Sequence, residues 1–242
     1  MAHFYLLESL ESTSVGSVVV LDGSEGRHAA TVSRVRVGES FALGNGRGLM
    51  VTAEVTSTTK DSVELRVVSV EQHQESSPKT YLVQALAKTD RDERAVEAAT
   101  ELGIDVVIPW AADRSISKWE GPKIEKGLSR WSAIVREASK QSIRAFVPQV
   151  DQHLKTTQLI SELSGVHLLV LDPTGSVPLS AVVLDSRDIA LVVGPEGGLS
   201  ESELLRFSES GATIVSLGHN ILRTSTAGPA ALAILNSKLG RC

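Results

Sequence analysis

The chain has 242 residues, of which 42% are hydrophobic and 22% are charged, and its formal net charge is −5. This length suits two domains with sizeable cores, and no apolar run approaches the roughly 18–20 residues that span a bilayer. The only cysteine is Cys242, which excludes an internal disulfide and a cysteine-based metal cluster. Because the N-terminus shows no secretory signal, we expect a cytoplasmic protein without a membrane segment.

The first third of the chain has the pattern of a small β domain. Short segments rich in Val, Thr and Leu are separated by turn-forming Gly, Asp and Asn residues. The expected strands are residues 17–21, 28–37, 39–43, 50–57 and 62–70. Closely spaced strands of this kind predict a β-barrel over residues 1–72. The polar, aperiodic stretch 71–79 predicts a linker.

From residue 79 to residue 242 the pattern changes to alternating strands and helices. The expected strands are 80–87, 104–110, 166–171, 189–193 and 213–217, and the expected helices are 89–102, 127–144, 200–210 and 226–238. Capping pairs are expected at Thr89 with Asp92 and at Ser200 with Glu203. This alternation predicts an α/β domain with a mostly parallel sheet, whose ligands bind beyond the carboxyl ends of its strands.

The helix expected over residues 127–144 is amphipathic and basic. Its apolar side chains, Trp131 among them, fall within one arc, and its Lys and Arg side chains fall on the opposite arc. Between Arg114 and Arg144 there are eight Lys or Arg against three Glu, a local charge of +5 in an acidic protein. This stretch is either a solvated helix face or a binding surface for phosphates.

Two loops at the expected strand ends carry candidate chemistry. After Val193 the chain reads Gly-Pro-Glu-Gly-Gly, which suits either a tight turn or a loop that approaches a ligand closely. It matches neither a dinucleotide fingerprint nor a Walker-type phosphate loop. After Leu217 it reads Gly-His-Asn-Ile-Leu-Arg-Thr-Ser-Thr-Ala, where the hydroxyls could simply cap the next helix and Arg223 could pair with a surface carboxylate.

Together, these two loops resemble the SPOUT superfamily of methyltransferases with a deep trefoil knot. Within it, the chain is similar to the ribosomal RNA small subunit methyltransferase E family, which methylates N3 of a uridine in 16S rRNA. The resemblance covers nearly the whole chain. It extends upstream to Ala-Lys-Thr-Asp-Arg at 87–91 and Glu-Ala-Ser-Lys-Gln-Ser-x-Arg at 137–144, while Glu-Gly-x-His at 25–28 resembles the family's PUA-like RNA-binding barrel.

The resemblance implies a knotted C-terminal domain that binds S-adenosylmethionine near the interface of a homodimer. The implied cofactor-binding residues are Leu171, Gly194, Glu196, Gly197, Gly198, Leu217, Gly218, Ile221, Leu222 and Thr226. The catalytic candidates are Arg223, as the cation that stabilises the uracil anion, and Glu196. Family members commonly carry Glu where this chain has Ser225, so the residue that removes the proton stays open.

The resemblance also implies that the basic stretch contacts 16S rRNA in the small ribosomal subunit. Its expected members are Lys88, Arg91, Arg94, Arg114, Arg136, Lys140 and Arg144. The six histidines have no metal-ligand spacing, so no metal is expected. Two alternatives stay open at this point: a knotted methyltransferase that acts on a ribose 2′-hydroxyl of tRNA or rRNA, and a non-catalytic RNA-binding ribosome-assembly factor.

Overall fold

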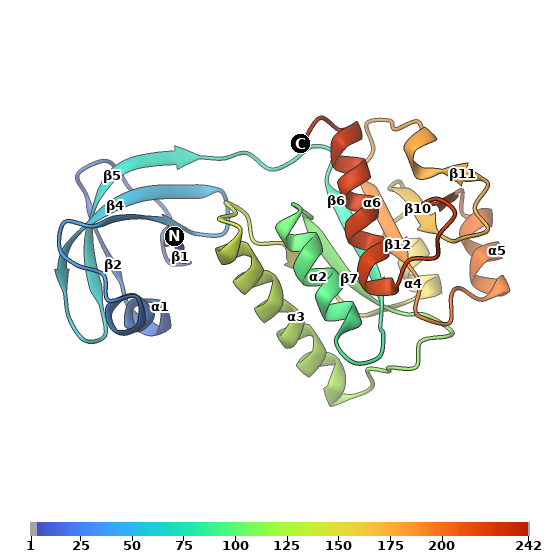
Figure 1. The fold of residues 1–242 in the computed structure, drawn as a ribbon, viewed down its shortest axis with the longest axis horizontal. Helices are drawn as coiled ribbons and strands as arrows, with labels where there is room; N and C mark the ends of the chain where they lie inside the picture. The colour runs from blue at the N-terminus through green and yellow to red at the C-terminus, as the bar shows by residue number, and fades with distance from the viewer. Residues whose placement is uncertain (1–3, 242) are drawn as a thin grey trace. The chain divides into compact units, whose positions relative to one another are not determined.

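The computed structural model describes residues 4–241, which divide into two compact units (Figure 1). Unit 1 holds the described residues up to Glu75 together with Ser139–Val147, and unit 2 holds Ser76–Ala138 and the chain from Pro148 onward. None of the helices between residues 4 and 241 combines the length and hydropathy of a membrane span. Within the same residues, no three His, Cys, Asp or Glu side chains are grouped as metal ligands.

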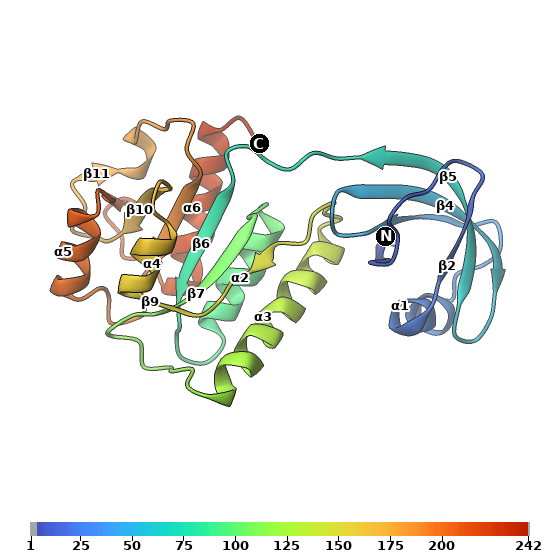
Figure 2. The ribbon, with the colours of Figure 1, turned by 180° about the vertical axis from the view of Figure 1, so that it is seen from behind.

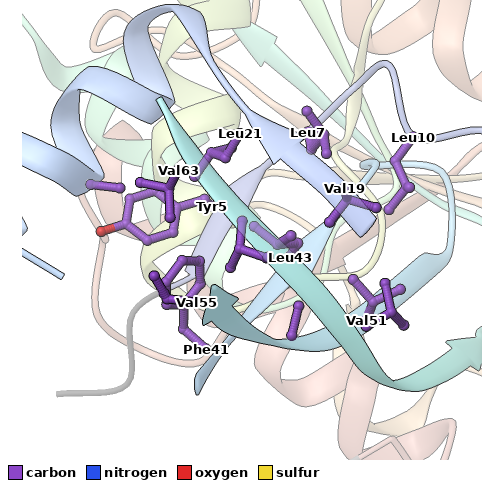
Figure 3. Close-up of a cluster of buried hydrophobic side chains, with 14 of the residues drawn as sticks. Tyr5, Leu7, Leu10, Val19, Leu21, Phe41, Leu43, Val51, Val55 and Val63 are labelled. Atoms are coloured by element: carbon purple, nitrogen blue, oxygen red, sulfur yellow. The ribbon is translucent and has the colours of Figure 1, made fainter. Parts of the chain in front are cut away.

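Unit 1 is built on a five-stranded sheet in the order β1-β3-β4-β5-β2. Its strands are β1 (Phe4–Leu6), β2 (Val18–Leu21), β3 (Ser40–Gly44), β4 (Leu49–Thr58) and β5 (Val63–Gln72). All neighbours are antiparallel except β1 and β3. Period-two alternation buries one side of β2, β4 and β5; in β2, for example, Val19 and Leu21 are buried while Val18 and Val20 are exposed. The buried set forms one apolar core around Tyr5, Phe41 and Leu43 (Figure 3).

The strand expected over residues 28–37 is wrong, because this segment is helical. A short helix, α1 (Gly23–Arg27), runs into a π-helical segment, His28–Ser33, that ends at Arg34 in a left-handed conformation. Ala29 is fully buried, and a Cβ at Gly26 would lie 2.3 Å from the carbonyl oxygen of Leu21. Close packing of these small residues therefore overrides the β propensity of the Thr and Val residues that follow.

The segment Ser139–Val147 packs in unit 1, although it lies inside the range 79–242 that the sequence pattern assigns to the second domain. The backbone N–H of Gly48 donates to the carbonyl of Ala145, and that of Val147 donates to the carbonyl of Gly46. This short segment mixes polar and apolar residues without periodicity, so it gives no sequence signal for such long-range backbone pairing.

Unit 2 is a parallel sheet with helices on both faces. Its main path is β11-β13-β10-β12-β6-β7-β8, and β9 also pairs with β7. The strands are β6 (Thr80–Ala85), β7 (Val106–Ala111), β8 (Gln149–Val150), β9 (Leu154–Lys155), β10 (His167–Leu171), β11 (Val177–Pro178), β12 (Ile189–Val193) and β13 (Thr213–Ser216). Every residue of β10 and β12 is buried, as expected of central parallel strands.

The two faces of this sheet carry different helices (Figures 1 and 2). The helices are α2 (Arg91–Glu101), α3 (Pro122–Gln141), α4 (Thr156–Glu162), α5 (Glu201–Glu209) and α6 (Thr224–Lys238). Helices α2 and α6 pack on each other and on β6 and β12. Leu159 of α4 and Phe207 of α5 join the apolar core of the opposite face. The four long helices expected from the sequence are confirmed, whereas α4 and the two-residue strands were too short to predict.

The two expected capping pairs have different outcomes. The pair at α5 is confirmed, because the Ser200 hydroxyl accepts from the Glu203 backbone and the Glu203 carboxylate accepts from that of Ser200. The pair at α2 is wrong: Thr89 has a positive φ of 59°, and the Asp92 carboxylate accepts from the backbone N–H groups of Ala87 and Glu93 instead. Asp92 therefore fixes the turn between β6 and α2.

The buried carboxyl of Asp92 gives unit 2 a testable pH dependence. Burial raises its pKa from 3.8 to about 6, and the charge of Glu93 adds to this effect, while hydrogen bonds from the backbone of Ala87 and Glu93 oppose it. A carboxyl whose pKa is raised by folding stabilises the fold below its unfolded pKa, and this contribution is lost as the pH rises through its folded pKa. From about pH 4 to about pH 7, the wild type should therefore lose about 2 kcal/mol of unfolding free energy relative to Asp92→Asn. Urea denaturation of both proteins across this range measures the difference, and parallel pH curves would contradict the assignment.

Candidate active site

Three strands of unit 2 end at one cavity. β10 lies between β12 and β13 and is parallel to both. The loops that follow Leu171, Val193 and Leu217 therefore meet at the same edge of the sheet. The cavity between them has a volume of about 330 Å³. The sequence prediction that these loops lie together is confirmed.

Most of the predicted site residues line this cavity. The lining includes Leu171, Gly194, Glu196, Gly198, Leu217, Gly218, Ile221, Leu222 and Arg223. Gly197 and Thr226 do not line it. The Gly197 carbonyl accepts from Arg114, and the exposed Thr226 donates its backbone N–H to the carbonyl of Arg223 in the first turn of α6.

The cavity has an apolar floor and a charged rim. The floor includes Val193, Leu199 and Val215, which are buried against the sheet. At the mouth, Ile221 is 81% exposed, an unusual environment for an aliphatic side chain. Arg91 and Arg223 contribute positive charge, and Asp172 and Glu196 contribute negative charge. This combination suits a ligand with an apolar ring system and polar or charged ends.

Glu196 connects the glycine loop to the end of β6. Its Oε1 accepts from the backbone N–H of Lys88 at 3.1 Å and from Nη1 of Arg91 at 3.0 Å. The Glu196 and Arg91 side chains are only 21% and 39% exposed, so this ion pair is partly shielded from solvent. The carboxylate therefore holds Arg91 at the rim of the cavity.

Arg223 is placed differently from Glu196. It is the N-cap residue of α6, its side chain is exposed, and it lines the cavity. Within residues 4–241 its guanidinium has no hydrogen-bond or ion-pair partner. A cation held at a cavity without an internal partner is available to a ligand. The alternative of a pair with a surface carboxylate is wrong.

A buried chain of hydrogen bonds joins the two glycine-bearing turns. Nε2 of Gln84 donates to Oγ1 of Thr224 at 2.9 Å, and that hydroxyl donates to the carbonyl of Gly194 at 2.8 Å. Gln84 is fully buried near the carboxyl end of β6. The hydroxyl of Thr224 therefore ties the turns together, and no side-chain hydroxyl caps α6. Gln84 was not among the predicted site residues, and its one signal in the sequence is a lone amide in an apolar strand.

The residues predicted to contact RNA are in varied environments. Arg94 pairs with Asp90 on the surface of α2, and Arg136 pairs with Glu137 on α3. Nζ of Lys140 lies 2.9 Å from the carboxylate of Glu25 in unit 1 and is only 17% exposed. Lys88, Arg91 and Arg114 lie close to the cavity through their bonds to Glu196 and Gly197. Arg144 lies in the segment that packs in unit 1.

Each of the two units matches a known protein family. Residues 74–236 match the family model of an RNA methyltransferase domain, and residues 21–68 match that of an RNA methyltransferase PUA domain. The chain is 40% identical over 238 residues to the ribosomal RNA small subunit methyltransferase E of Mycobacterium tuberculosis, covering 96% of this chain and 90% of that protein. The chain belongs to the ribosomal RNA small subunit methyltransferase E family. The Bacillus subtilis member of this family is 30% identical over 226 residues, covering 89% of this chain and 88% of that protein.

Solved structures of methyltransferases share the fold of this chain. The enzyme of Neisseria gonorrhoeae, bound to S-adenosyl methionine, has a TM-score of 0.87 and 31% identity, with 98% of each chain covered. A methyltransferase of Legionella pneumophila, also with bound S-adenosyl methionine, has a TM-score of 0.87 and 30% identity with the same coverage. The resemblance identified from the two loops is therefore confirmed.

Proposed function

We propose that this chain transfers a methyl group from S-adenosylmethionine to N3 of a uridine in 16S rRNA. We further propose that its substrate is the assembled small ribosomal subunit and that it acts in the cytoplasm. The observation that carries this proposal is the closure of both glycine-bearing turns on one cavity with Arg223 at its edge. Membership of the methyltransferase E family supports the same conclusion.

The cavity fits the chemical make-up of S-adenosylmethionine. Leu171, Leu217 and Leu222 offer apolar contacts for an adenine ring, and the exposed Ile221 would be covered by it. Gly194 and Gly218 let the backbone approach a ligand closely, and Gly218 has a φ of 119° that other residues rarely adopt. The rim charges of Arg91 and Asp172 suit the carboxylate and ammonium of the methionine portion.

The proposed reaction requires the uracil imide to become an anion in line with the methyl group. When bound, S-adenosylmethionine supplies a methyl carbon on a sulfonium; the N3 lone pair forms the new N–C bond as the S–C bond breaks and its electrons return to sulfur. Arg223 stabilises the negative charge on the uracil oxygens as N3 loses its proton. Oε1 of Glu196 already accepts two hydrogen bonds, so we assign the proton to solvent and give Glu196 a positioning role.

We also propose that the C-terminal segment threads a deep trefoil knot, that the strands of unit 1 close as a PUA-like barrel, and that the chain forms a homodimer. The chain path supports the knot: β13 pairs with β10 and β11, yet α6 returns across the sheet to pack on α2 and β12. Sedimentation equilibrium tests the homodimer, which predicts twice the chain mass of 25.8 kDa.

Methyl transfer to isolated small subunits, compared with naked 16S rRNA, tests the proposed function. Nucleoside mass spectrometry should find 3-methyluridine, with faster transfer to the subunit. A methylated ribose would replace the uridine-N3 target by a 2′-hydroxyl target. Absence of transfer together with retained RNA binding would instead indicate a non-catalytic assembly factor.

Removing the hydroxyl of Thr224 should weaken cofactor binding without unfolding the protein. Thr224→Val keeps the side-chain shape but deletes the bonds to the Gly194 carbonyl and to Nε2 of Gln84, and leaving a buried polar group without its partner costs about 1–3 kcal/mol. We therefore expect a roughly 10-fold weaker Kd for S-adenosylmethionine by calorimetry. Thr224→Ser retains the hydroxyl and is the matched control. Equal affinity of the Val and Ser variants would show that the bridge does not shape the cavity.

RNA affinity should fall steeply with salt. If about six Lys and Arg side chains contact phosphates, log Kd should change linearly with log salt, with a slope of about 4–5 for single-stranded RNA. Fluorescence anisotropy of a labelled 16S rRNA fragment between about 50 and 200 mM KCl measures this slope. A flat response would remove the basic residues from the proposed RNA surface.

A further inference from the structure

A second pocket of unit 2 lies at the carboxyl ends of β7 and β9 and has a volume of about 470 Å³. Three cationic side chains from three separate segments line it: Lys118 precedes α3, Lys155 ends β9, and Arg206 lies on α5. Its two carboxylates are Asp113 and Glu120. Oδ2 of Asp113 accepts from the hydroxyls of Ser200 and Ser202, so its charge is already partly compensated. The pocket therefore favours an anionic ligand.

One wall of this pocket is aromatic. The Trp119 indole and the His153 imidazole line it, with centroids 5.7 Å apart and an interplanar angle of 39°. The indole is supported from behind by Gly127 of α3, where a Cβ would lie 2.5 Å from the ring, and it contacts the edge of Trp131. Such a rigidly backed aromatic wall is suited to packing against a nucleobase.

A buried hydroxyl of the pocket has no partner within the protein. Ser115 lines the pocket and is 6% exposed, and its Oγ makes no hydrogen bond to any residue between 4 and 241. A buried hydroxyl without a partner is costly. This cost is removed when a ligand in the pocket supplies a donor or an acceptor.

A hydrogen bond between Arg114 and Gly197 links the second pocket to the cofactor cavity. Nη1 of Arg114, next to Ser115, donates to the carbonyl of Gly197 at 3.1 Å. Gly197 in turn lies between Glu196 and Gly198, both of which line the cofactor cavity. A polymer with one residue at the cavity mouth can therefore place a neighbouring residue in the second pocket.

We propose that this second pocket is a subsite for a nucleotide of the RNA next to the methylated uridine. Its base packs against Trp119 and His153, and its phosphate lies near Lys118, Lys155 and Arg206. The proposal rests on the proposed function, which supplies an RNA substrate. It adds an interaction that holds the target strand in place.

Tryptophan fluorescence can test the subsite directly. Of the three tryptophans, Trp110 and Trp131 are fully buried and Trp119 is the one that lines the pocket. Titration with a single-stranded oligoribonucleotide from 16S rRNA should therefore quench Trp119 emission. Anisotropy of the same labelled oligonucleotide measures total RNA binding in parallel.

The second test removes positive charge from the pocket. The double variant Lys118→Ala/Lys155→Ala should bind the oligonucleotide about 10-fold more weakly and lower its salt slope by about 1.4, because each lysine neutralises one phosphate of a single strand. The double variant Arg187→Ala/Lys238→Ala removes the same charge and is the control; Arg187 precedes β12, Lys238 ends α6, and neither lines the pocket, so it should bind like wild type. Calorimetry should show unchanged S-adenosylmethionine affinity in both variants.

The outcomes separate the subsite from the proposed function. Methyl transfer with unchanged tryptophan emission, or a Lys118→Ala/Lys155→Ala variant that binds RNA like the Arg187→Ala/Lys238→Ala control, overturns the subsite alone. Absence of both transfer and RNA binding in the wild type overturns the proposed function and the subsite with it.

Discussion

Replacing Arg223 with alanine is expected to lower kcat for methyl transfer about 10²–10³-fold, because a preorganised donor that stabilises a developing oxyanion typically contributes this much. The side chain borders the cavity and has no ion-pair partner within residues 4–241, so its charge is not used to hold the fold. The unfolding free energy should therefore change by no more than about 0.5 kcal/mol.

Two controls separate chemistry from binding in this experiment. Arg223→Lys keeps the charge but loses the planar guanidinium fork, so we expect intermediate activity. Arg187→Ala removes a surface arginine that pairs with Asp185 and should leave transfer unchanged. The measurement is single-turnover transfer at saturating RNA, with the Kd for S-adenosylmethionine determined separately. Near-normal turnover of Arg223→Ala with tight cofactor binding would exclude Arg223 from the reaction.

The sequence predicted the parts of the site that local patterns encode. The glycine loop after Val193 and the loop after Leu217 follow buried parallel strands, and parallel strands end at a common edge, so their meeting could be inferred without coordinates. The helices of unit 2 were predictable for a similar reason, since their apolar periodicity and glycine ends are local signals.

The features that could not be predicted from the sequence depend on contacts between distant segments. The bond from Gln84 to Thr224 joins residues 140 positions apart, and Glu203, predicted only as a capping residue, also accepts from the backbone of Asp113 and the hydroxyl of Thr156. Packing around Gly26 likewise converts a β-like sequence to a helix. In each case the structural role of a residue depends on the space or the hydrogen-bond partner that a distant part of the chain provides.

Gly175 is a further residue whose role only the fold reveals. It follows β10 in the turn Asp172-Pro173-Thr174-Gly175, where its backbone N–H donates to the Asp172 carbonyl. A Cβ at Gly175 would lie 2.6 Å from the carbonyl carbon of Val215 and 2.9 Å from the carbonyl oxygen of Ile214. These are backbone atoms of β13, which cannot rotate away as the end of a side chain can. Gly175 is therefore required for space.

Gly175→Ala is accordingly expected to destabilise unit 2 and weaken cofactor binding together. Overpacking of this kind costs about 1–3 kcal/mol, and relief of the clash must displace β13, whose Val215 lines the cofactor cavity. We expect a lower urea midpoint and a Kd for S-adenosylmethionine at least about 10-fold weaker, since each 1.4 kcal/mol is a factor of ten.

Gly165→Ala is the matched control, because the position has a positive φ of 89° but open space around its Cβ. It should lose about 1 kcal/mol from backbone strain alone and bind the cofactor like wild type. If Gly175→Ala also bound the cofactor like wild type, β13 would have moved without changing the position of the cavity wall. The close approach of the β10 loop to β13 would then not be required for cofactor binding.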